Sequence, residues 1–321
     1  TTVAKINGYT VSIVGAGSSV ITASQEGDSN YKAADEVIRT LIVNKADQNI
    51  TFDALNTKTF GDNSFTLSGT TSSGLPLVYE SSDTSVAKIT DNTVTIVGAG
   101  SASISANQSG SNDYNSATEV VQSITIAKAN QSISFAAPET KTYGDADFSL
   151  SASSTSGLPV SYVISDTSIA KISGNIVSIN GAGSTTITAS QSGNNDYNAA
   201  NDVTQTLTVE KLSQTIAFDT LPEKTYGDEA FVLTASSGSN LDISYVSSNT
   251  SVASISGDTL TILGTGSTTI TASQEGNESY QAADDVSRVL TVNKASQSIA
   301  FNSLASKTYG DENFALEATA S

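Results

Sequence analysis

Oxygen-bearing side chains that could bind a calcium ion gather in the segment 193–202. Calcium takes roughly six to eight oxygen ligands from carboxylates, amides and carbonyls. The segment supplies Asn194, Asn195, Asp196 and Asp202. The fixed spacing of an EF-hand loop is missing, and Asn and Asp are also the ordinary residues of turns. Two interpretations stay open, a calcium site or a solvated turn, and the turn is the simpler.

Side chains that could perform acid–base catalysis are scarce in this sequence. His, Cys, Met and Trp are absent, so a Ser-His-acid triad cannot form and metal sites built on thiolates are excluded. Adjacent carboxylates occur at Asp35 and Glu36, Asp228 and Glu229, and Asp284 and Asp285. Glycoside hydrolysis uses two carboxylates that flank one scissile bond within the same cleft, whereas neighbours on a strand point to opposite faces. We therefore predict a protein that is not an enzyme and has no cofactor, apart from the calcium alternative.

The net charge of the chain limits the classes of partner that it can bind. The net charge is −18, with only 14 Lys and Arg among 321 residues. Nucleic-acid binding needs a basic face, so we expect no nucleic-acid partner. No stretch approaches the roughly 20 apolar residues of a membrane span. An acidic surface instead keeps neighbouring molecules soluble and apart.

Several sequence motifs recur along the chain with a period of 83 residues. A glycine of Gly-Ala-Gly or Gly-Thr-Gly is found at Gly15, Gly98, Gly181 and Gly264. The aromatic residue of Lys-Thr-Tyr/Phe-Gly-Asp is found at Phe60, Tyr143, Tyr226 and Tyr309. A fixed period shared by independent landmarks indicates one structural unit used several times. Because a tandem array presents the same surface at each step, we expect a structural or adhesive function.

The period divides the chain into three whole repeats, residues 45–127, 128–210 and 211–293. Residues 1–44 correspond to the rear part of a repeat, and residues 294–321 to the front part of another. Both ends fall inside a repeat, so we expect the sequence to be a piece of a longer polypeptide. Neighbouring repeats of that chain are then the first partners of each unit.

Each repeat reads as strands and turns. Apolar residues alternate with Ser and Thr, as in Ile50 and Phe52 or Val94 and Ile96, and this period of two is that of a half-buried strand. Gly, Asn and Asp between the runs suit tight turns. The pattern predicts an all-β fold of antiparallel two-sheet sandwiches. The connection 124–135 contains neither Gly nor Pro, so we expect stiff joints and an extended rod.

Two further sets of recurring residues are predicted to be structural. The tyrosine of Gly-x-x-x-Tyr is found at Tyr31, Tyr114, Tyr197 and Tyr280. We interpret it as a corner tyrosine whose ring fills the edge of the core and whose hydroxyl bonds the backbone; carbohydrate stacking is the alternative. The aspartate that follows the turn glycine is found at Asp62, Asp145, Asp228 and Asp311. It is predicted to close the turn, with an interdomain contact or a calcium ligand as alternatives.

Several segments resemble known bacterial repeats. Residues 165–172 (Ser-Asp-Thr-Ser-Ile-Ala-Lys-Ile) and 177–189 resemble the bacterial immunoglobulin-like group 2 repeat. Residues 141–145 and 156–162 are similar to repeats of very large surface adhesins, including those of gliding Bacteroidota. The resemblance covers nearly the whole chain, although Asn-Leu-Asp at 240–242 replaces the usual Gly-Leu-Pro.

The resemblance implies tandem Ig-like modules exported to the bacterial cell surface. It also implies that a separate domain outside this sequence binds the surface glycan or the host or substratum ligand, and it provides no catalytic residues. We therefore expect the stalk or filament body of a surface adhesin. The alternatives are a multivalent glycan-binding module and an accessory spacer of an extracellular hydrolase.

Overall fold

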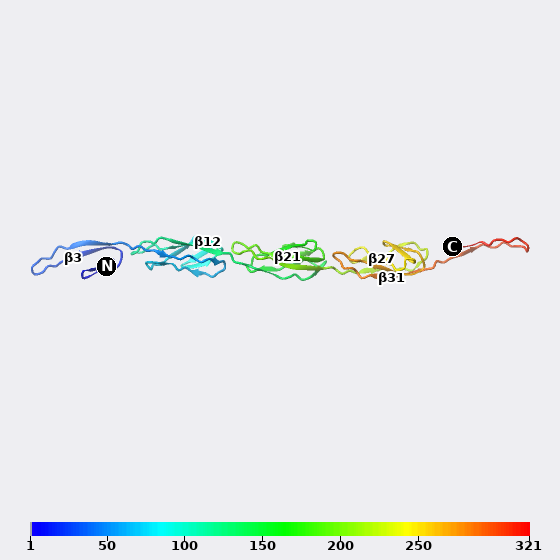
Figure 1. Cartoon of the computed structure of the whole chain (residues 1–321), viewed down its shortest axis with the longest axis horizontal. Helices are drawn as coiled ribbons and strands as arrows, with labels where there is room; N and C mark the ends of the chain where they lie inside the picture. The colour runs from blue at the N-terminus through cyan, green and yellow to red at the C-terminus, as the bar shows by residue number, and fades with distance from the viewer. Residues whose placement is uncertain (1) are drawn as a thin grey trace. The chain divides into compact units, whose positions relative to one another are not determined.

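The structure is a computed structural model that describes residues 2–321. Every element labelled in Figure 1 is a β-strand, and no helix occurs in the described range. None of these residues therefore forms a helix long and apolar enough to cross a membrane. The chain divides into two compact units. Unit 1 holds the residues up to Ser134, Ala152–Ser161 and Ala189–Val203, and unit 2 holds Phe135–Ser151, Tyr162–Thr188 and Thr204–Ser321.

Unit 1 contains all three sheets of repeat 45–127. The four-stranded sheet has the order β6 (Lys58–Thr59), β13 (Val120–Ala127), β12 (Gly100–Asn107) and β9 (Val78–Ser81). The three-stranded sheet has the order β10 (Ala87–Thr90), β11 (Thr93–Ile96) and β7 (Phe65–Thr66). A short ladder joins β5 (Ile50–Thr51) to β8 (Thr70–Thr71). Pairing is antiparallel throughout, except that β6 runs parallel to β13.

The core of this repeat lies between its sheets. Ile104 and Ile124 come from the four-stranded sheet and Val94 from the three-stranded sheet, and all three side chains are fully buried. Ile104 and its neighbour Ser105 lie on opposite sides of β12, because successive side chains of a strand alternate. Two sheets with one shared apolar core form a β-sandwich.

Repeat 211–293, in unit 2, has the same topology. Its four-stranded sheet runs β24 (Lys224–Thr225), β31 (Val286–Asn293), β30 (Gly266–Ser273) and β27 (Ser244–Ser247). Its smaller sheets are β25 (Phe231–Val232) with β29 (Thr259–Ile262) and β28 (Ala253–Ser256), and β23 (Ile216–Phe218) with β26 (Ala235–Ser237). The prediction of an all-β chain of tandem Ig-like sandwiches is confirmed.

The intervening residues 128–210 are divided between the two units. Their strands are β14 (Ile133–Phe135), β15 (Lys141–Thr142), β16 (Phe148–Ser149), β17 (Ala152–Ser154), β18 (Ser161–Ile164), β19 (Ala170–Ser173), β20 (Ile176–Ile179), β21 (Gly183–Ser190) and β22 (Val203–Glu210). Within unit 2, β20 pairs with β16 and β19 as β11 pairs with β7 and β10, and β15 runs parallel to β22.

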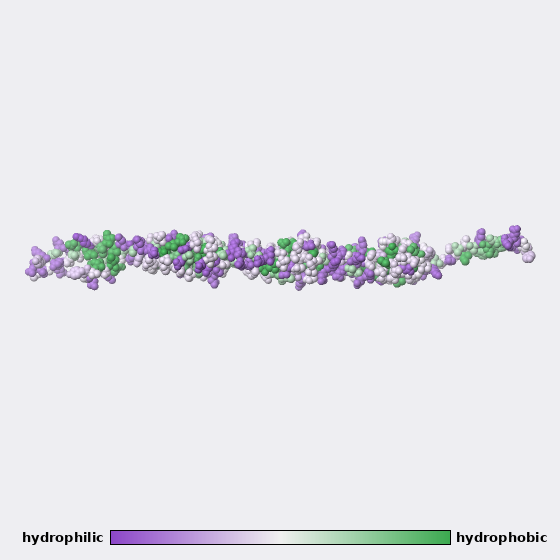
Figure 2. Space-filling model, in the orientation of Figure 1, coloured by the Kyte–Doolittle hydropathy of each residue, from purple (hydrophilic) through white to green (hydrophobic). Residues whose placement is uncertain are grey.

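The strands outside the whole repeats expose residues that whole repeats bury. These strands are β1 (Ala4–Asn7), β2 (Thr10–Ile13), β3 (Gly17–Ala23), β4 (Val37–Val43), β32 (Ile299–Phe301) and β33 (Ala318–Ala320). Val11 is 42% exposed where its equivalent Val94 is fully buried, and Phe301 is 52% exposed where Phe218 is 3% exposed. Apolar residues accordingly show on the visible surface of residues 1–44 in Figure 2. Burial therefore requires the front and rear strands of a repeat together.

Candidate functional site: the junction between repeats

Between repeats 45–127 and 128–210, a single residue separates two backbone segments, each hydrogen-bonded to its own repeat. At the end of one repeat, the carbonyl of Ala127 accepts a hydrogen bond of 2.9 Å from the amide of Phe60. At the start of the next, the amide of Ala129 donates to the carbonyl of Asp196 at 2.9 Å. Only Lys128 stands between these two anchored residues. We call this contact region, which lies within unit 1, the Lys128 junction.

The junction lysine is itself tied to the repeat that it begins. The Nζ atom of Lys128 donates to the carbonyl of Asn194 at 2.7 Å. Lys45 makes the same bond to Ser111 at 2.7 Å, and Lys211 makes it to Asn277 at 2.6 Å. We name the corresponding regions the Lys45 junction, in unit 1, and the Lys211 junction, in unit 2. Side chain and backbone together therefore fix the chain at each crossing.

A carboxylate of one repeat binds the glycine turn of the repeat before it. At the Lys128 junction, Oδ1 of Asp196 accepts a hydrogen bond of 2.8 Å from the amide of Ala99. At the Lys45 junction, Asp113 accepts the equivalent bond from Ala16 at 2.7 Å. The turn needs Gly98 because a Cβ there would lie 2.7 Å from the carbonyl oxygen of Ser85 and 3.2 Å from Oδ1 of Asp196. At these two junctions the Gly-Ala-Gly turn therefore binds a carboxylate of the following repeat.

Aromatic rings form a second contact at two of the junctions. The ring of Tyr197 meets Phe60 edge to face, with centroids 5.4 Å apart and an interplanar angle of 83°. At the Lys211 junction, Tyr280 meets Tyr143 at 5.5 Å and 75°. Such geometry is the preferred arrangement of aromatic pairs and adds to the area that they bury. Two of the landmarks that recur along the sequence therefore meet across the junction.

The loop that carries these groups is closed by its own side chains. Oδ1 of Asn194 accepts hydrogen bonds of 2.9 Å from the amides of both Asp196 and Tyr197. Gly193 has φ of +76°, and a Cβ there would lie 2.4 Å from the carbonyl oxygen of Tyr197. The loop thus presents Asp196 and Tyr197 side by side toward the preceding repeat.

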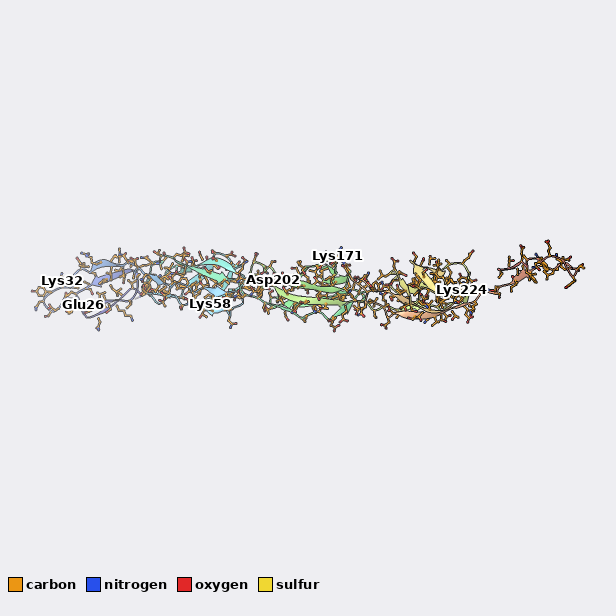
Figure 3. The ribbon with its side chains drawn as sticks, turned by 45° about the vertical axis from the view of Figure 1, so that its right-hand side comes forward. Glu26, Lys32, Lys58, Lys171, Asp202 and Lys224 are labelled. Atoms are coloured by element: carbon orange, nitrogen blue, oxygen red, sulfur yellow. The ribbon has the colours of Figure 1, made fainter. Side chains whose placement is uncertain are left out.

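The four calcium candidates take different places in this loop. Asn194 closes the turn and Asp196 binds the turn of the preceding repeat, whereas Asn195 and Asp202 are exposed. Asp202 is labelled in Figure 3. Within residues 2–321, no three His, Cys, Asp or Glu side chains gather in a way that could hold a metal ion. Calcium binding stays a prediction, and two of its candidate ligands already have other bonds.

The recurring tyrosines are held by their backbone. Tyr114, Tyr197 and Tyr280 each form an isolated parallel bridge to the residue after the junction lysine, whereas Tyr31 is 76% exposed. The bond expected of a corner tyrosine, from a hydroxyl to the backbone, is made in this structure by a different residue. The amide of Gly69 donates to the hydroxyl of Tyr79 at 2.8 Å. Tyr79 recurs as Tyr162 and Tyr245 with the 83-residue period, and this recurrence is the signal that could have identified it.

The recurring aspartates close their turns. Oδ2 of Asp62 accepts a hydrogen bond of 2.9 Å from the amide of Thr59, and the amide of Asp62 donates to the Thr59 carbonyl at 3.0 Å. The same pair of bonds is present at Asp145, Asp228 and Asp311. Beside each turn a lysine ammonium lies over a phenylalanine ring, at 4.6 Å for Lys224 and Phe231. The motif therefore holds the end of the sandwich.

Two acidic turns differ in charge from their counterpart in the third whole repeat. The hydroxyl of Ser85 donates to Oδ1 of Asp83 at 2.6 Å, and its amide does so at 2.8 Å. These bonds, the hydroxyl first, hold the pKa of Asp83 below its usual value. Ser168 lowers the pKa of Asp166 in the same way. In repeat 211–293 the uncharged Asn249 accepts the equivalent bond from Ser251.

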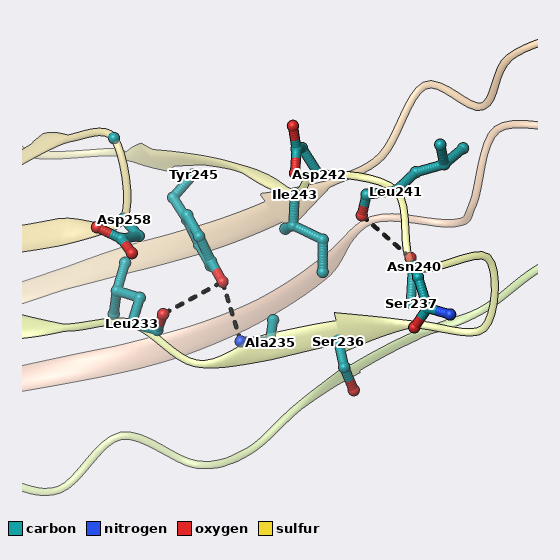
Figure 4. A pocket seen from close by; sticks show the side chains of 11 residues that line it. Leu233, Ala235, Ser236, Ser237, Asn240, Leu241, Asp242, Ile243, Tyr245 and Asp258 are labelled. Carbon is teal, nitrogen blue, oxygen red and sulfur yellow. Dashed lines mark hydrogen bonds between the residues drawn. The ribbon is translucent and has the colours of Figure 1, made fainter.

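A hollow lies in the repeat that departs from Gly-Leu-Pro. It has a volume of about 480 Å³ and is lined by Leu233, Ile243 and Tyr245 together with polar residues of the 236–242 loop. Asn240 has φ of +57°, so the replaced loop is left-handed at that point. Figure 4 shows the Tyr245 hydroxyl bonded to Ala235 and Leu233, as Tyr79 bonds Gly69. The hydroxyl thus serves the fold and is not left over for a ligand.

Comparisons with known proteins find solved structures that are similar to this chain only at low identity and low TM-score. No protein-family model matches, and no curated protein matches. Drosophila N-cadherin EC1-4 is 15% identical, with a TM-score of 0.24, over 86% of this chain and 83% of that one. Sidekick-1 immunoglobulin domains 1-5 are 12% identical, with a TM-score of 0.27, over 84% of this chain and 65% of that one. Surface layer protein SbsC, domains 1-6, is 15% identical, with a TM-score of 0.24, over 96% of this chain and 55% of that one. At these values nothing about ligand or activity follows.

Proposed function

We propose that this chain is a segment of the stalk or filament body of a bacterial cell-surface adhesin. It lies outside the cell, has no catalytic activity, and provides reach and tensile strength to a binding domain located elsewhere in a longer polypeptide. The segments 45–127, 128–210 and 211–293 are its folding units, with 1–44 and 294–321 as parts of further units. Its immediate partners are the neighbouring repeats.

The observation that carries the proposal is the single residue between anchored backbones at the Lys128 and Lys211 crossings. A tensile force pulls along the chain through Ala127, Lys128 and Ala129, and both flanking residues are hydrogen-bonded to their own repeat. The tensile force is therefore transmitted directly from one sandwich to the next, because no flexible linker separates them. In repeat 45–127, β6 runs parallel to the last strand, β13. Pulling the ends of such a repeat apart loads several ladder bonds at once, which resists extension.

The alternative of a multivalent glycan-binding module requires exposed aromatic rings. Tyr197 and Tyr280, two of the four recurring tyrosines for which sugar stacking is the alternative, each meet an aromatic residue of the preceding repeat and are only partly exposed. A ring engaged in this way has less surface for a sugar. The stalk proposal is therefore the one that the contacts favour.

Two experiments test the proposal. Small-angle X-ray scattering should give an elongated particle with the cross-section of one sandwich, and a compact particle would contradict it. Stretching single molecules by their ends should give three unfolding events of equal length. Each should be about 25 nm, because 83 extended residues span roughly 28 nm and the folded repeat already spans roughly 3 nm. Fewer or unequal events would contradict the division into three units. A signal on a glycan array would favour the alternative function.

A further inference from the structure

We infer that the junctions are not equally stiff and that the Lys211 junction is the flexible joint of this chain. The inference starts from one residue. The aspartate that binds the glycine turn across the junction is Asp113 in one repeat and Asp196 in the next, but Ser279 occupies the equivalent position in repeat 211–293. A serine side chain is shorter than an aspartate side chain and carries no charge.

The contact is missing where the serine stands. Among residues 2–321, no hydrogen bond joins Ser279 to the amide of Ala182, the equivalent of Ala99. A Cβ built on Gly98 would lie 3.2 Å from Oδ1 of Asp196, whereas one built on Gly181 would meet only the Ser168 carbonyl. The turn of residues 181–183 therefore has no carboxylate against it.

The contacts that remain between the two repeats at the Lys211 junction lie at the turn that carries Tyr143, whose ring meets that of Tyr280. Within repeat 211–293, the amide of Leu212 donates to the carbonyl of Ser279 at 3.0 Å. The side chain of Leu212 also reaches the turn at Gly144, where a built Cβ would lie 3.8 Å from it. The equivalent of Leu212 at the Lys128 junction is Ala129, so leucine adds apolar contact where the carboxylate contact has been lost.

Geometry then distinguishes the two joints. The Lys128 junction is attached at two separate turns, one through Phe60 and Tyr197 and the other through Ala99 and Asp196. Two attachments oppose bending about either one. The Lys211 junction keeps only the attachment at the tyrosine turn, and the apolar contact of Leu212 is not directional. It can therefore bend about the Tyr143 and Tyr280 contact while the backbone bonds of the crossing stay intact.

The size of the effect follows from the lost bond. A hydrogen bond to a charged acceptor changes an equilibrium by roughly ten- to a hundredfold. We therefore expect bent conformations to be more populated at the Lys211 junction than at the Lys128 junction by a factor of about this size. The comparison holds whether or not the chain acts as a stalk, because both junctions are measured in the same molecule.

Double electron–electron resonance on the whole chain tests the inference. The sequence has no cysteine, so spin labels can be placed on introduced pairs alone. The pair Ser123→Cys and Ser161→Cys spans the Lys128 junction, and Thr206→Cys with Ser244→Cys spans the Lys211 junction. The two pairs are equivalent under the 83-residue period, and all four positions are exposed. The distance distribution should be broader for the second pair.

Exchanging Asp and Ser between positions 196 and 279 should exchange the stiffness of the two junctions. Ser279→Asp should narrow the distribution across the Lys211 junction, and Asp196→Ser should broaden the one across the Lys128 junction. Ser279→Ala is the matched control and should change nothing, because the serine makes no contact with the turn. Equal widths for the two pairs in the unsubstituted chain would overturn the inference. So would a Ser279→Asp chain that keeps its melting temperature and its broad distribution.

Discussion

The carboxylate of Asp196 accepts a 2.8 Å hydrogen bond from the amide of Ala99, a residue 97 positions earlier in the preceding repeat. The bond joins two of the landmarks that recur along the chain, the glycine turn and the residue before the recurring tyrosine. It leaves the interior of each sandwich untouched. Its consequences should therefore appear at the junction and not in the cores.

Substitution of Asp196 by Ala should expose the Lys128 crossing to protease. Loss of the charged acceptor leaves the Ala99 amide without a partner, so local opening becomes more frequent by about tenfold or more. The measurement is the rate of tryptic cleavage after Lys128 in the native chain, followed by intact mass. Cleavage after Lys45 serves as the control, because Asp113 still binds the turn at that junction. An unchanged rate at Lys128 would show that the bond does not hold the crossing.

The aromatic contact should show as a coupling between repeats. Phe60→Leu and Tyr197→Leu should each destabilise the junction, and the double variant should be less destabilised than the sum of the two. The expected coupling energy is about 0.5 to 1.5 kcal/mol. Hydrogen exchange at the amides around the Lys128 crossing measures it. A coupling energy near zero would mean that the contact between the two rings does not stabilise the junction.

Acid should weaken the first two whole repeats through Asp83 and Asp166. The folded state holds the pKa of both carboxyls below the unfolded value. Their contribution is therefore fully present above the unfolded pKa of about 3.9 and is lost as the pH falls through the lower, folded pKa. Asn249 accepts the same kind of bond without a charge to titrate, so repeat 211–293 lacks this term.

The matching variant is the double substitution Asp83→Asn and Asp166→Asn, which copies Asn249. Its melting temperature should fall less steeply than that of the unsubstituted chain as the pH is lowered from 5 to 2. The two chains share every other carboxylate, so the difference between the two curves isolates this pair. If the two curves of melting temperature against pH are parallel, groups other than Asp83 and Asp166 cause the loss of stability in acid.

Truncation of the core should destabilise a single repeat. Ile104 is fully buried between the sheets of repeat 45–127, and Ile104→Ala should cost about 2 to 5 kcal/mol. Val121→Ala, on the outward face of β13 where Val121 is 52% exposed, is the control and should cost about 0.5 kcal/mol or less. Hydrogen exchange of the 100–107 peptide resolves this repeat from its neighbours. Equal effects of the two substitutions would contradict the assignment of the two faces of this sheet.

The buried hydroxyl of Tyr79 should contribute separately from its ring. Tyr79→Phe keeps the ring, which packs at 5.4 Å from Phe52, and removes the acceptor of the Gly69 amide. The expected loss is about 1 kcal/mol. Hydrogen exchange within repeat 45–127 would measure it. Tyr9→Phe, at a fully exposed tyrosine, is the control and should leave stability unchanged.

The period and the alternation of apolar and polar residues were enough to predict the class of fold. Val94 and Ile104 are buried, as the alternating pattern requires, because the two faces of a strand follow directly from backbone geometry. The turn role of Asp62 was also visible in the sequence, since Asp beside Gly closes turns through bonds to residues only three positions away.

The roles of the tyrosines were harder to read. Tyr197 recurs with three other tyrosines and Tyr79 with two, so recurrence alone does not distinguish their roles. Only the fold shows that the Tyr79 hydroxyl bonds the backbone inside its own sandwich, whereas the Tyr197 ring meets Phe60 of the preceding repeat. Recurrence marked the junction residues without saying what they touch.

The amino-acid sequence by itself determined the unit of construction, because strand alternation and turn chemistry are local properties that repeat with the residues. It did not determine how one unit meets the next. That was decided by tertiary structure, which brings Ala99 against Asp196 and leaves Ala182 without such a partner. Contacts between surfaces of different repeats depend on where each fold places its turns, and a periodic sequence carries no local sign of that placement.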